Sequence, residues 1–116
     1  MKPRSIGLLQ YLDASALLAY LQAESGADIV ETALLKGAAI SAINWAETLS
    51  KRAEKGQNPD DVTQKLRKEG LLDNAVQVYP VDETLACKIA ELRSPARSLG
   101  LSLGDRACLA LALQLN

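Results

Sequence analysis

Three short apolar runs, separated by segments of helical pattern, constrain the fold of this chain more than any other feature. The runs cover residues 8–13, 38–43 and 76–80. Continuous apolar strands that alternate with helices are typical of a parallel sheet buried on both faces. The sequence therefore predicts an α/β fold of three layers, with a short central parallel sheet flanked by helices.

Start and stop signals for helices lie between these runs. Asn44, Asn58 and Asp82 are residue types that cap the start of a helix, and Gly56 is one that ends it. The last helix is apolar on nearly every side, so it is expected to be buried. No repeat or linker interrupts the 116 residues, which are expected to form a single domain over residues 1–116. The expected helices cover residues 14–23, 27–35, 44–55, 58–69, 83–93 and 105–115.

Composition excludes several classes of function. The chain has no histidine, which rules out Ser-His-Asp and Cys-His nucleophiles, histidine zinc sites and histidine general bases. Its two cysteines, Cys87 and Cys108, lie in apolar helical stretches and form no C-x-x-C pair, so a reduced, cytoplasmic setting is expected. No apolar run approaches the roughly 18 residues that a membrane span needs, and no export signal is expected. Any catalysis must use carboxylates, amines, hydroxyls or a metal.

The net charge is only −1, but the charges are distributed unevenly. Residues 51–68 carry six basic and three acidic side chains, and residues 93–106 carry Arg93, Arg97 and Arg106 against Asp105 alone. Either stretch could contact phosphate. For the first stretch a solvated helix face is the favoured interpretation, and for the second the two interpretations are equal.

Three acids stand where a ligand could bind. Asp13 ends the first apolar run, and open parallel sheets bind ligands beyond the carboxyl ends of their strands. Taken alone, Asp13 is better explained as a helix cap, a role that Ser15 could also fill. Glu47 borders the apolar stripe of its helix, so it either reaches solvent or has a cationic partner. Asp105 lies in the first turn of the last helix, on its inward face, where the helix dipole offers a structural alternative.

Carboxylates that converge without histidine or cysteine indicate a hard cation. Mg²⁺ or Mn²⁺ accepts oxygen ligands, keeps several waters and is completed by a substrate phosphate. The chemistry that such an ion supports is hydrolysis of a phosphodiester, because it activates water and stabilises charge on the phosphate. Asp82 also follows a strand, but it is interpreted as a helix cap and left out of this site.

The segments that carry these acids resemble a known family. Residues 12–19, 40–47 and 103–112 are similar to the first three acidic blocks of PIN domains, above all those of VapC-type toxins from bacterial and archaeal toxin–antitoxin pairs. The resemblance implies a Mg²⁺- or Mn²⁺-dependent endoribonuclease that forms a homodimer and is inhibited by an antitoxin protein. It assigns metal coordination to Asp13, Glu47 and Asp105 and a supporting contact to Ser15.

Further residues are expected to assist this site. Asn44 lies three residues before Glu47, on nearly the same helix face, and could orient it. Arg106 and Arg97 are expected to hold RNA phosphate, or the antitoxin when the enzyme is inhibited.

The chain departs from the PIN pattern at its end. The family continues past the last helix into a further strand and a Thr-x-Asp motif with another acid, whereas this sequence stops at Asn116. The first strand is therefore expected to have an open edge, and a shortened chain or a strand supplied by another chain is expected.

Two other functions compete with the nuclease. The first is a catalytically degenerate PIN-like module that dimerises or binds a partner without cleaving. The second is an acidic-pocket phosphatase or phosphoacceptor receiver, which ranks low because Ser15 stands where such a phosphatase has its second Asp. Phosphate-binding loops of the G-x-x-x-x-G-K and G-x-G-x-x-G types are absent as well.

Overall fold

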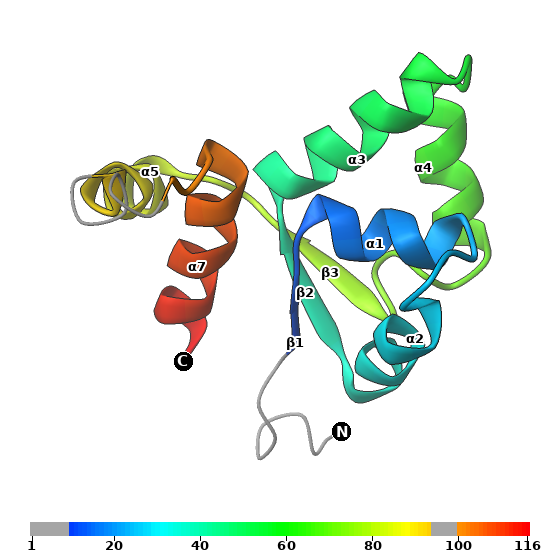
Figure 1. The fold of residues 1–116 in the computed structure, drawn as a ribbon, viewed down its shortest axis with the longest axis horizontal. Helices are drawn as coiled ribbons and strands as arrows, with labels where there is room; N and C mark the ends of the chain where they lie inside the picture. Colours follow the sequence, from blue (N-terminus) through cyan, green and yellow to red (C-terminus); the bar gives the residue numbers. More distant parts are fainter. Residues whose placement is uncertain (1–9, 94–99) are drawn as a thin grey trace.

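A parallel sheet of three strands divides the molecule into layers (Figure 1). The computed structural model describes residues 10–93 and 100–116. Its strands are β1 (Gln10–Leu12), β2 (Ala38–Ser41) and β3 (Val76–Tyr79), paired in the order β1-β2-β3. The register places Leu12 opposite Ile40 and Ser41 opposite Tyr79. The predicted α/β class with a central parallel sheet is confirmed.

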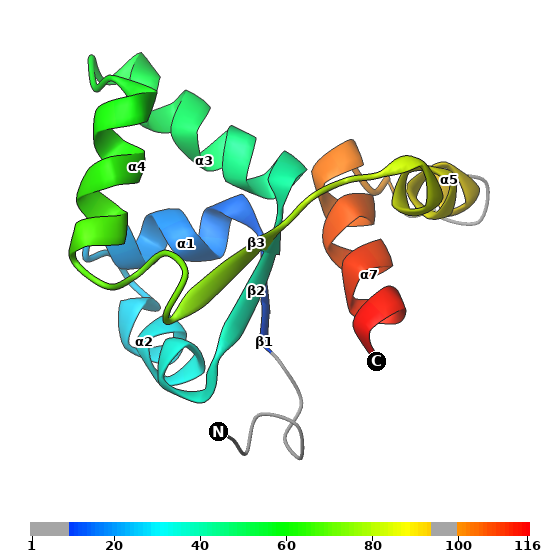
Figure 2. The same ribbon diagram turned by 180° about the vertical axis from the view of Figure 1, so that it is seen from behind.

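Six helices in the described residues cover the two faces of the sheet. Figures 1 and 2 place α1 to α4 on one face and α5 and α7 on the other. Parallel strands joined by right-handed crossovers that all step in one direction keep their connecting helices on one side, which explains the first layer. The helices are α1 (Ala14–Leu21), α2 (Ala27–Lys36), α3 (Ala42–Glu54), α4 (Pro59–Lys68), α5 (Glu83–Glu91) and α7 (Leu103–Leu115).

Strand β2 supplies side chains to two separate cores. Successive side chains of a strand point to opposite faces, so Ala38 and Ile40 pack with the α1–α4 layer while Ala39 packs with α5 and α7. All four residues of β2 are buried, as expected for the middle strand of a covered parallel sheet.

Two helices begin earlier than the sequence pattern predicts. Ser41, rather than Asn44, caps α3, and its hydroxyl oxygen accepts a hydrogen bond from the backbone N–H of Asn44. Ser102 caps α7, which therefore begins at Leu103 rather than at Asp105. Serine satisfies the free N–H groups of a first turn as well as asparagine does, so composition alone did not separate the candidates. As a result the Asn44 side chain lies inside the first turn of α3 and is free for other contacts.

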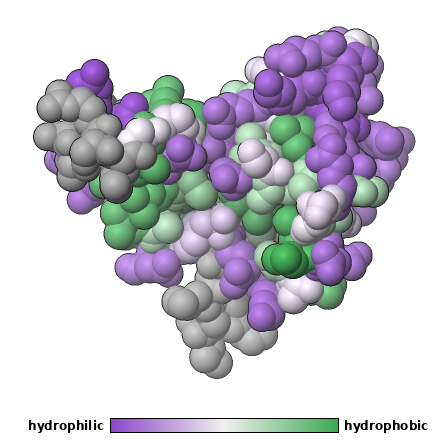
Figure 3. Space-filling view, viewed as in Figure 1, coloured by the Kyte–Doolittle hydropathy of each residue, from purple (hydrophilic) through white to green (hydrophobic). Residues whose placement is uncertain are grey.

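The expectation that the last helix is buried on nearly every side is wrong. Leu103, Leu109 and Leu113 of α7 are exposed, whereas Ala107, Ala110 and Leu111 are buried against the sheet and α5. Only one side of α7 faces the sheet, and the small alanines let it approach closely. Figure 3 shows a hydrophobic area over α7, and hydrophilic surface over the far ends of α3 and α4.

Strand β1 lies at one edge of the sheet. Among the described residues it pairs with β2 alone, in agreement with the open edge expected from the sequence. No helix within residues 10–93 and 100–116 is long and apolar enough to cross a membrane.

Candidate active site

A pocket of about 190 Å³ opens where the strands end and the first turns of α1, α3 and α7 meet. Figures 1 and 2 both show these three helix starts close to one another beyond the carboxyl ends of the strands. All three acids expected to form the site lie in its wall. The lining residues are Asp13, Ala14, Ser15, Leu18, Asn44, Glu47, Lys51, Ser102, Gly104 and Asp105.

Asp13 is the N-cap of α1. Its Oδ1 accepts a hydrogen bond of 2.8 Å from the backbone N–H of Ala16, so the helix-cap interpretation from the sequence is correct. In the described part of the chain Oδ2 accepts no hydrogen bond. Asp13 therefore combines a structural role with a free oxygen in the wall of the pocket.

Asp105 is held by a capping box at the start of α7. Its Oδ2 accepts a hydrogen bond of 3.0 Å from the backbone N–H of Ser102, and the Ser102 hydroxyl oxygen accepts one of 3.1 Å from the Asp105 N–H. The carboxylate is exposed rather than turned toward the core, which corrects the inward face expected from the sequence. Its position at the positive end of a helix stabilises the negative charge.

Glu47 is oriented by Asn44. The Asn44 side-chain amide donates a hydrogen bond of 3.2 Å to Glu47 Oε1 and another of 3.1 Å to the backbone carbonyl of Gly104. One amide group thus joins the acid of α3 to the first turn of α7. The predicted orienting contact between Asn44 and Glu47 is present in the structure.

Asn44 is itself fixed by a buried polar network. Its side chain is fully buried, and its Oδ1 accepts a hydrogen bond of 2.6 Å from the Ser41 hydroxyl. The Thr48 hydroxyl, also fully buried, donates to the Asn44 carbonyl at 2.9 Å. Buried polar groups that are all hydrogen-bonded define one rotamer and make the surrounding packing specific. The amide that holds Glu47 is therefore pre-organised.

Gly104 provides the space for the Glu47 carboxylate. A Cβ atom at this position would lie 2.6 Å from Glu47 Oε1 and 2.8 Å from Oε2, closer than real Cβ contacts. Any larger residue would push the carboxylate away from its place beside α7. The glycine is required here by the close approach of a side chain.

The three acids share a pattern. One oxygen of each is held by a hydrogen bond from a helix N–H, a loop N–H or the Asn44 amide, and the other accepts none within the described residues. No three acidic or sulfur side chains there gather closely enough to form a metal cluster. Mg²⁺ is usually held by one or two carboxylates and several waters, so an all-protein cage is not needed. The oxygen donors of this pocket fit such a hard cation.

The pKa of the Cys108 thiol is affected by burial and by the negative charges of the site. Burial, followed by the charges of Asp13 and Asp105, raises the pKa of its thiol above the usual value. Its thiol is therefore kept protonated at neutral pH. Neither Cys108 nor the exposed Cys87 is in a disulfide.

The other residues predicted to assist the site are Ser15, Arg106 and Arg97, and of those that the structure describes only Ser15 is found in the pocket wall. Ser15 lies in the pocket wall and is exposed. Arg106 does not line the pocket: its Nη1 donates a hydrogen bond of 3.1 Å to the backbone carbonyl of Ile89 in α5. Its contact with RNA or an antitoxin stays a prediction. Arg97 lies outside the described residues.

Among the pocket residues that sequence reasoning did not assign to the site, Lys51 and Gly104 bear most directly on its charge and shape. Lys51 follows Glu47 by four positions, the spacing that places two side chains on one helix face, so its position was predictable. It also forms an exposed ion pair with Glu54 at 3.8 Å. Gly104 gave a weaker signal, a glycine next to an apolar helix, where glycine costs stability and often has a packing reason.

The fold and the pocket together define an α/β protein with an oxygen-lined acidic site at the carboxyl edge of a parallel sheet. A family model, the PIN domain, matches residues 10–116. The chain belongs to the PIN domain family. PIN domains are generally metal-dependent nucleases. Comparisons with curated proteins and with solved structures gave no match.

Proposed function

We propose that this chain is a metal-dependent endoribonuclease that hydrolyses phosphodiester bonds of RNA in the acidic pocket. The observation that carries the proposal is the meeting of Asp13, Glu47 and Asp105, from three separate segments, in the wall of one pocket. Each contributes one oxygen fixed by a hydrogen bond and one that is free. This arrangement supplies anionic oxygens at defined positions without a close cluster of charge, which would be costly.

The free oxygens of these acids are the groups that would hold Mg²⁺ or Mn²⁺. Such an ion supplies activation of a water and stabilisation of charge on the phosphate. The chain's own part is to position these groups: the helix starts fix Asp13 and Asp105, and Asn44 fixes Glu47. Lys51 adds a cation to the pocket wall, where it can contact a substrate phosphate.

The finer parts of the proposal rest on sequence resemblance. The acidic blocks at residues 12–19, 40–47 and 103–112 support a VapC-type toxin with RNA as substrate and an antitoxin protein as inhibitor. The exposed leucines of α7, Leu109 and Leu113, support a homodimer, because association would cover them. A short antitoxin gene beside the gene of this chain would support the toxin role.

Cleavage of a labelled RNA with Mn²⁺ or Mg²⁺ tests the proposal. Asp13→Asn and Asp105→Asn should each abolish cleavage, because they remove the charge while an amide oxygen can still accept the capping hydrogen bond. Asp82→Asn is the matched control: Asp82 also caps a helix, accepting from the Leu85 N–H at 2.9 Å, but it does not line the pocket. Cleavage that persists in Asp13→Asn or Asp105→Asn would reject the assignment.

A degenerate PIN module that does not cleave is the second candidate. The absence of a closely gathered group of three acids within the described residues favours it. Titration with Mn²⁺, followed by electron paramagnetic resonance, separates the two. Carboxylate-dependent Mn²⁺ binding with RNA cleavage supports the nuclease, whereas neither binding nor cleavage by the wild type supports the degenerate module.

A further inference from the structure

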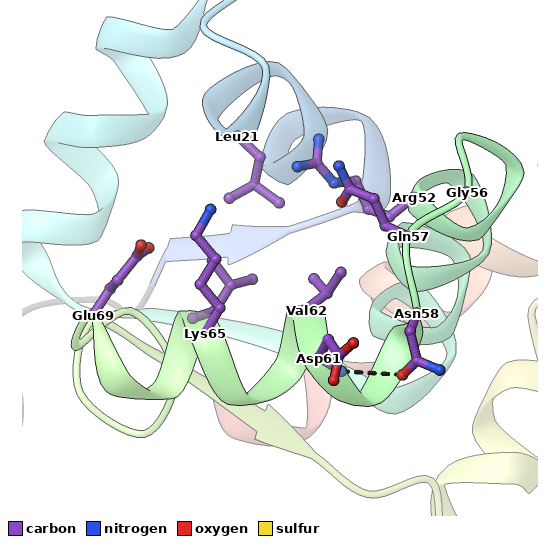
Figure 4. A pocket seen from close by; sticks show the side chains of 10 residues that line it. Leu21, Arg52, Gly56, Gln57, Asn58, Asp61, Val62, Lys65 and Glu69 are labelled. Atoms are coloured by element: carbon purple, nitrogen blue, oxygen red, sulfur yellow. Dashed lines mark hydrogen bonds between the residues drawn. The ribbon is translucent and has the colours of Figure 1, made fainter.

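A second pocket, of about 400 Å³, lies where the C-terminal ends of α1 and α3 face α4 (Figure 4). Most of its wall comes from the basic stretch at residues 51–68, of which the acidic pocket uses only Lys51. Its lining residues are Leu21, Arg52, Gly56, Gln57, Asn58, Asp61, Val62, Lys65, Leu66 and Glu69.

Two cations line this pocket, Arg52 and Lys65. Arg52 is half-buried, and its Nε is fully buried without a hydrogen bond in the described residues. Neither Arg52 nor Lys65 forms an ion pair within that part of the chain. Figure 4 shows both side chains extending toward the same space beside Leu21. Arg52 and Lys65 both line the pocket, so an anion there would give these two cations an acceptor.

The acids of the pocket lie at its ends. Asp61 is in the first turn of α4, next to Asn58, and Glu69 follows the last turn of the same helix. Figure 4 shows them on opposite sides of Lys65. The pocket therefore offers a positive centre between two negative ends, which suits a single anionic group with neutral neighbours. One phosphate of a nucleic acid strand, with the uncharged sugars on either side of it, can occupy such a centre.

The second pocket continues the acidic one along the same two helices. Leu18 and Lys51 line the acidic pocket, and Leu21 and Arg52 line the second. On α1 the step is one turn, about 5 Å along the helix axis. The two pockets therefore adjoin along α1 and α3, so a strand that leaves the acidic pocket in this direction would next meet the second one.

We propose that Arg52 and Lys65, assisted by Gln57, form a subsite for a phosphate of single-stranded RNA that flanks the bond in the acidic pocket. This inference rests on the proposed ribonuclease function. Arginine matches phosphate through paired N–H donors, and lysine adds a point charge. Figure 3 shows hydrophilic surface over the far ends of α3 and α4, which suits contact with a polar strand.

Binding without cleavage tests the subsite directly. The full chain is titrated, in EDTA, into a fluorescein-labelled single-stranded RNA of twelve nucleotides, and anisotropy is followed at several NaCl concentrations. The double variant Arg52→Gln/Lys65→Gln should bind about tenfold more weakly at low salt. Its slope of log K against log salt should fall by about 0.7, since the subsite holds one phosphate and each phosphate contact on a single strand contributes about 0.7.

Matched controls separate the pocket from general charge. Lys68→Gln neutralises an exposed lysine of the same helix that does not line the pocket, so it should leave affinity within about twofold of the wild type. Arg52→Lys keeps the charge and should keep the salt slope. Lys65 is exposed, so Lys65→Gln should fold normally and still lose part of the affinity. Equal losses in Lys65→Gln and Lys68→Gln would overturn the subsite.

A cleavage arm distinguishes the subsite from the nuclease. With Mn²⁺ present, the double variant should raise KM for the twelve-nucleotide RNA but leave a dinucleotide, which reaches only the acidic pocket, unaffected. An unchanged KM for the long RNA would reject the subsite while the nuclease stands. Loss of RNA binding in the double variant of a chain that never cleaves would support the subsite and reject the nuclease.

A peptide probe tests the other kind of anion. A ten-residue oligoglutamate is titrated against the wild type and the double variant under the same conditions. If the double variant loses the peptide but keeps its affinity for RNA, the pocket binds an acidic protein tail and the RNA subsite is wrong. If the wild type binds the peptide weakly and the double variant loses affinity for RNA, the subsite is supported.

Discussion

The two ends of helix α3 differ in whether their buried polar side-chain atoms are hydrogen-bonded. Around the first two turns Ser41, Asn44 and Thr48 are fully buried and hydrogen-bonded, and the Asn44 amide joins α3 to α7. Toward the last turns Arg52 keeps a buried Nε with no hydrogen bond in the described residues, beside a pocket open to solvent. One helix thus carries a satisfied polar network and an unsatisfied cation about two turns apart.

This difference in hydrogen bonding suits the two ends of α3 to different roles. A network in which every group is hydrogen-bonded holds a side chain in one position, which suits an acid that must meet a reacting group. A cation without a partner keeps its interaction free for a ligand, and its attraction depends on salt. The N-terminal end of α3 therefore holds the Glu47 side chain in place, and the C-terminal end offers Arg52 to a ligand.

Asn44→Ala should remove the buried hydrogen-bond network at the N-terminal end of α3 and give the largest loss of stability. It leaves the Gly104 carbonyl and the Ser41 hydroxyl without their buried partner, at a cost of about 2–3 kcal/mol in the free energy of unfolding. Urea denaturation measures the change. Ser50→Ala is the control, because Ser50 is exposed on the same helix and its hydroxyl bonds only to the Ala46 carbonyl. A loss below about 0.5 kcal/mol in Asn44→Ala would contradict a fixed network.

Gly104→Ala should move the Glu47 carboxylate while changing the stability of the fold only slightly. The added methyl displaces the flexible Glu47 carboxylate, while alanine favours the helix, so unfolding should change by no more than about 1 kcal/mol. Cleavage and Mn²⁺ affinity should nevertheless fall, as measured by RNA assay and metal titration. The control is the Glu47→Ala background, where the methyl has no carboxylate to displace and Gly104→Ala should become stabilising. Full activity of Gly104→Ala would show that the position of Glu47 does not matter.

Arg52→Met should have the smallest effect on stability, in contrast to the substitution of Asn44 at the other end of α3. Methionine keeps most of the apolar stem and removes a guanidinium nitrogen that lacks an acceptor, so unfolding should change by less than about 0.5 kcal/mol, or become harder. Thermal unfolding measures this, with Lys68→Met as the surface control. Destabilisation by more than about 1.5 kcal/mol would mean that Arg52 serves the fold rather than a ligand.

The sequence predicted the architecture well because apolar runs and helix signals are local. The strands, their parallel arrangement and the caps at Asn58 and Asp82 follow from neighbouring residues alone. The starts of α3 and α7 were placed too late, since Ser41 and Ser102 compete with nearby polar residues for the same N–H groups. The burial of α7 was overestimated because an apolar helix pattern does not say how much surface the neighbouring elements will cover.

The sequence by itself determined which side chains are available: three acids beyond three chain segments, no histidine, and a basic stretch after the second strand. The resemblance to PIN domains predicted that the three acids meet, and the tertiary structure decided how each of them is held. It placed Asp13, Glu47 and Asp105 around one pocket, fitted Glu47 against Gly104, and turned Arg106 to the Ile89 carbonyl. Such contacts join residues tens of positions apart, and their geometry depends on how helices pack on the sheet. Local patterns carry no information about that packing.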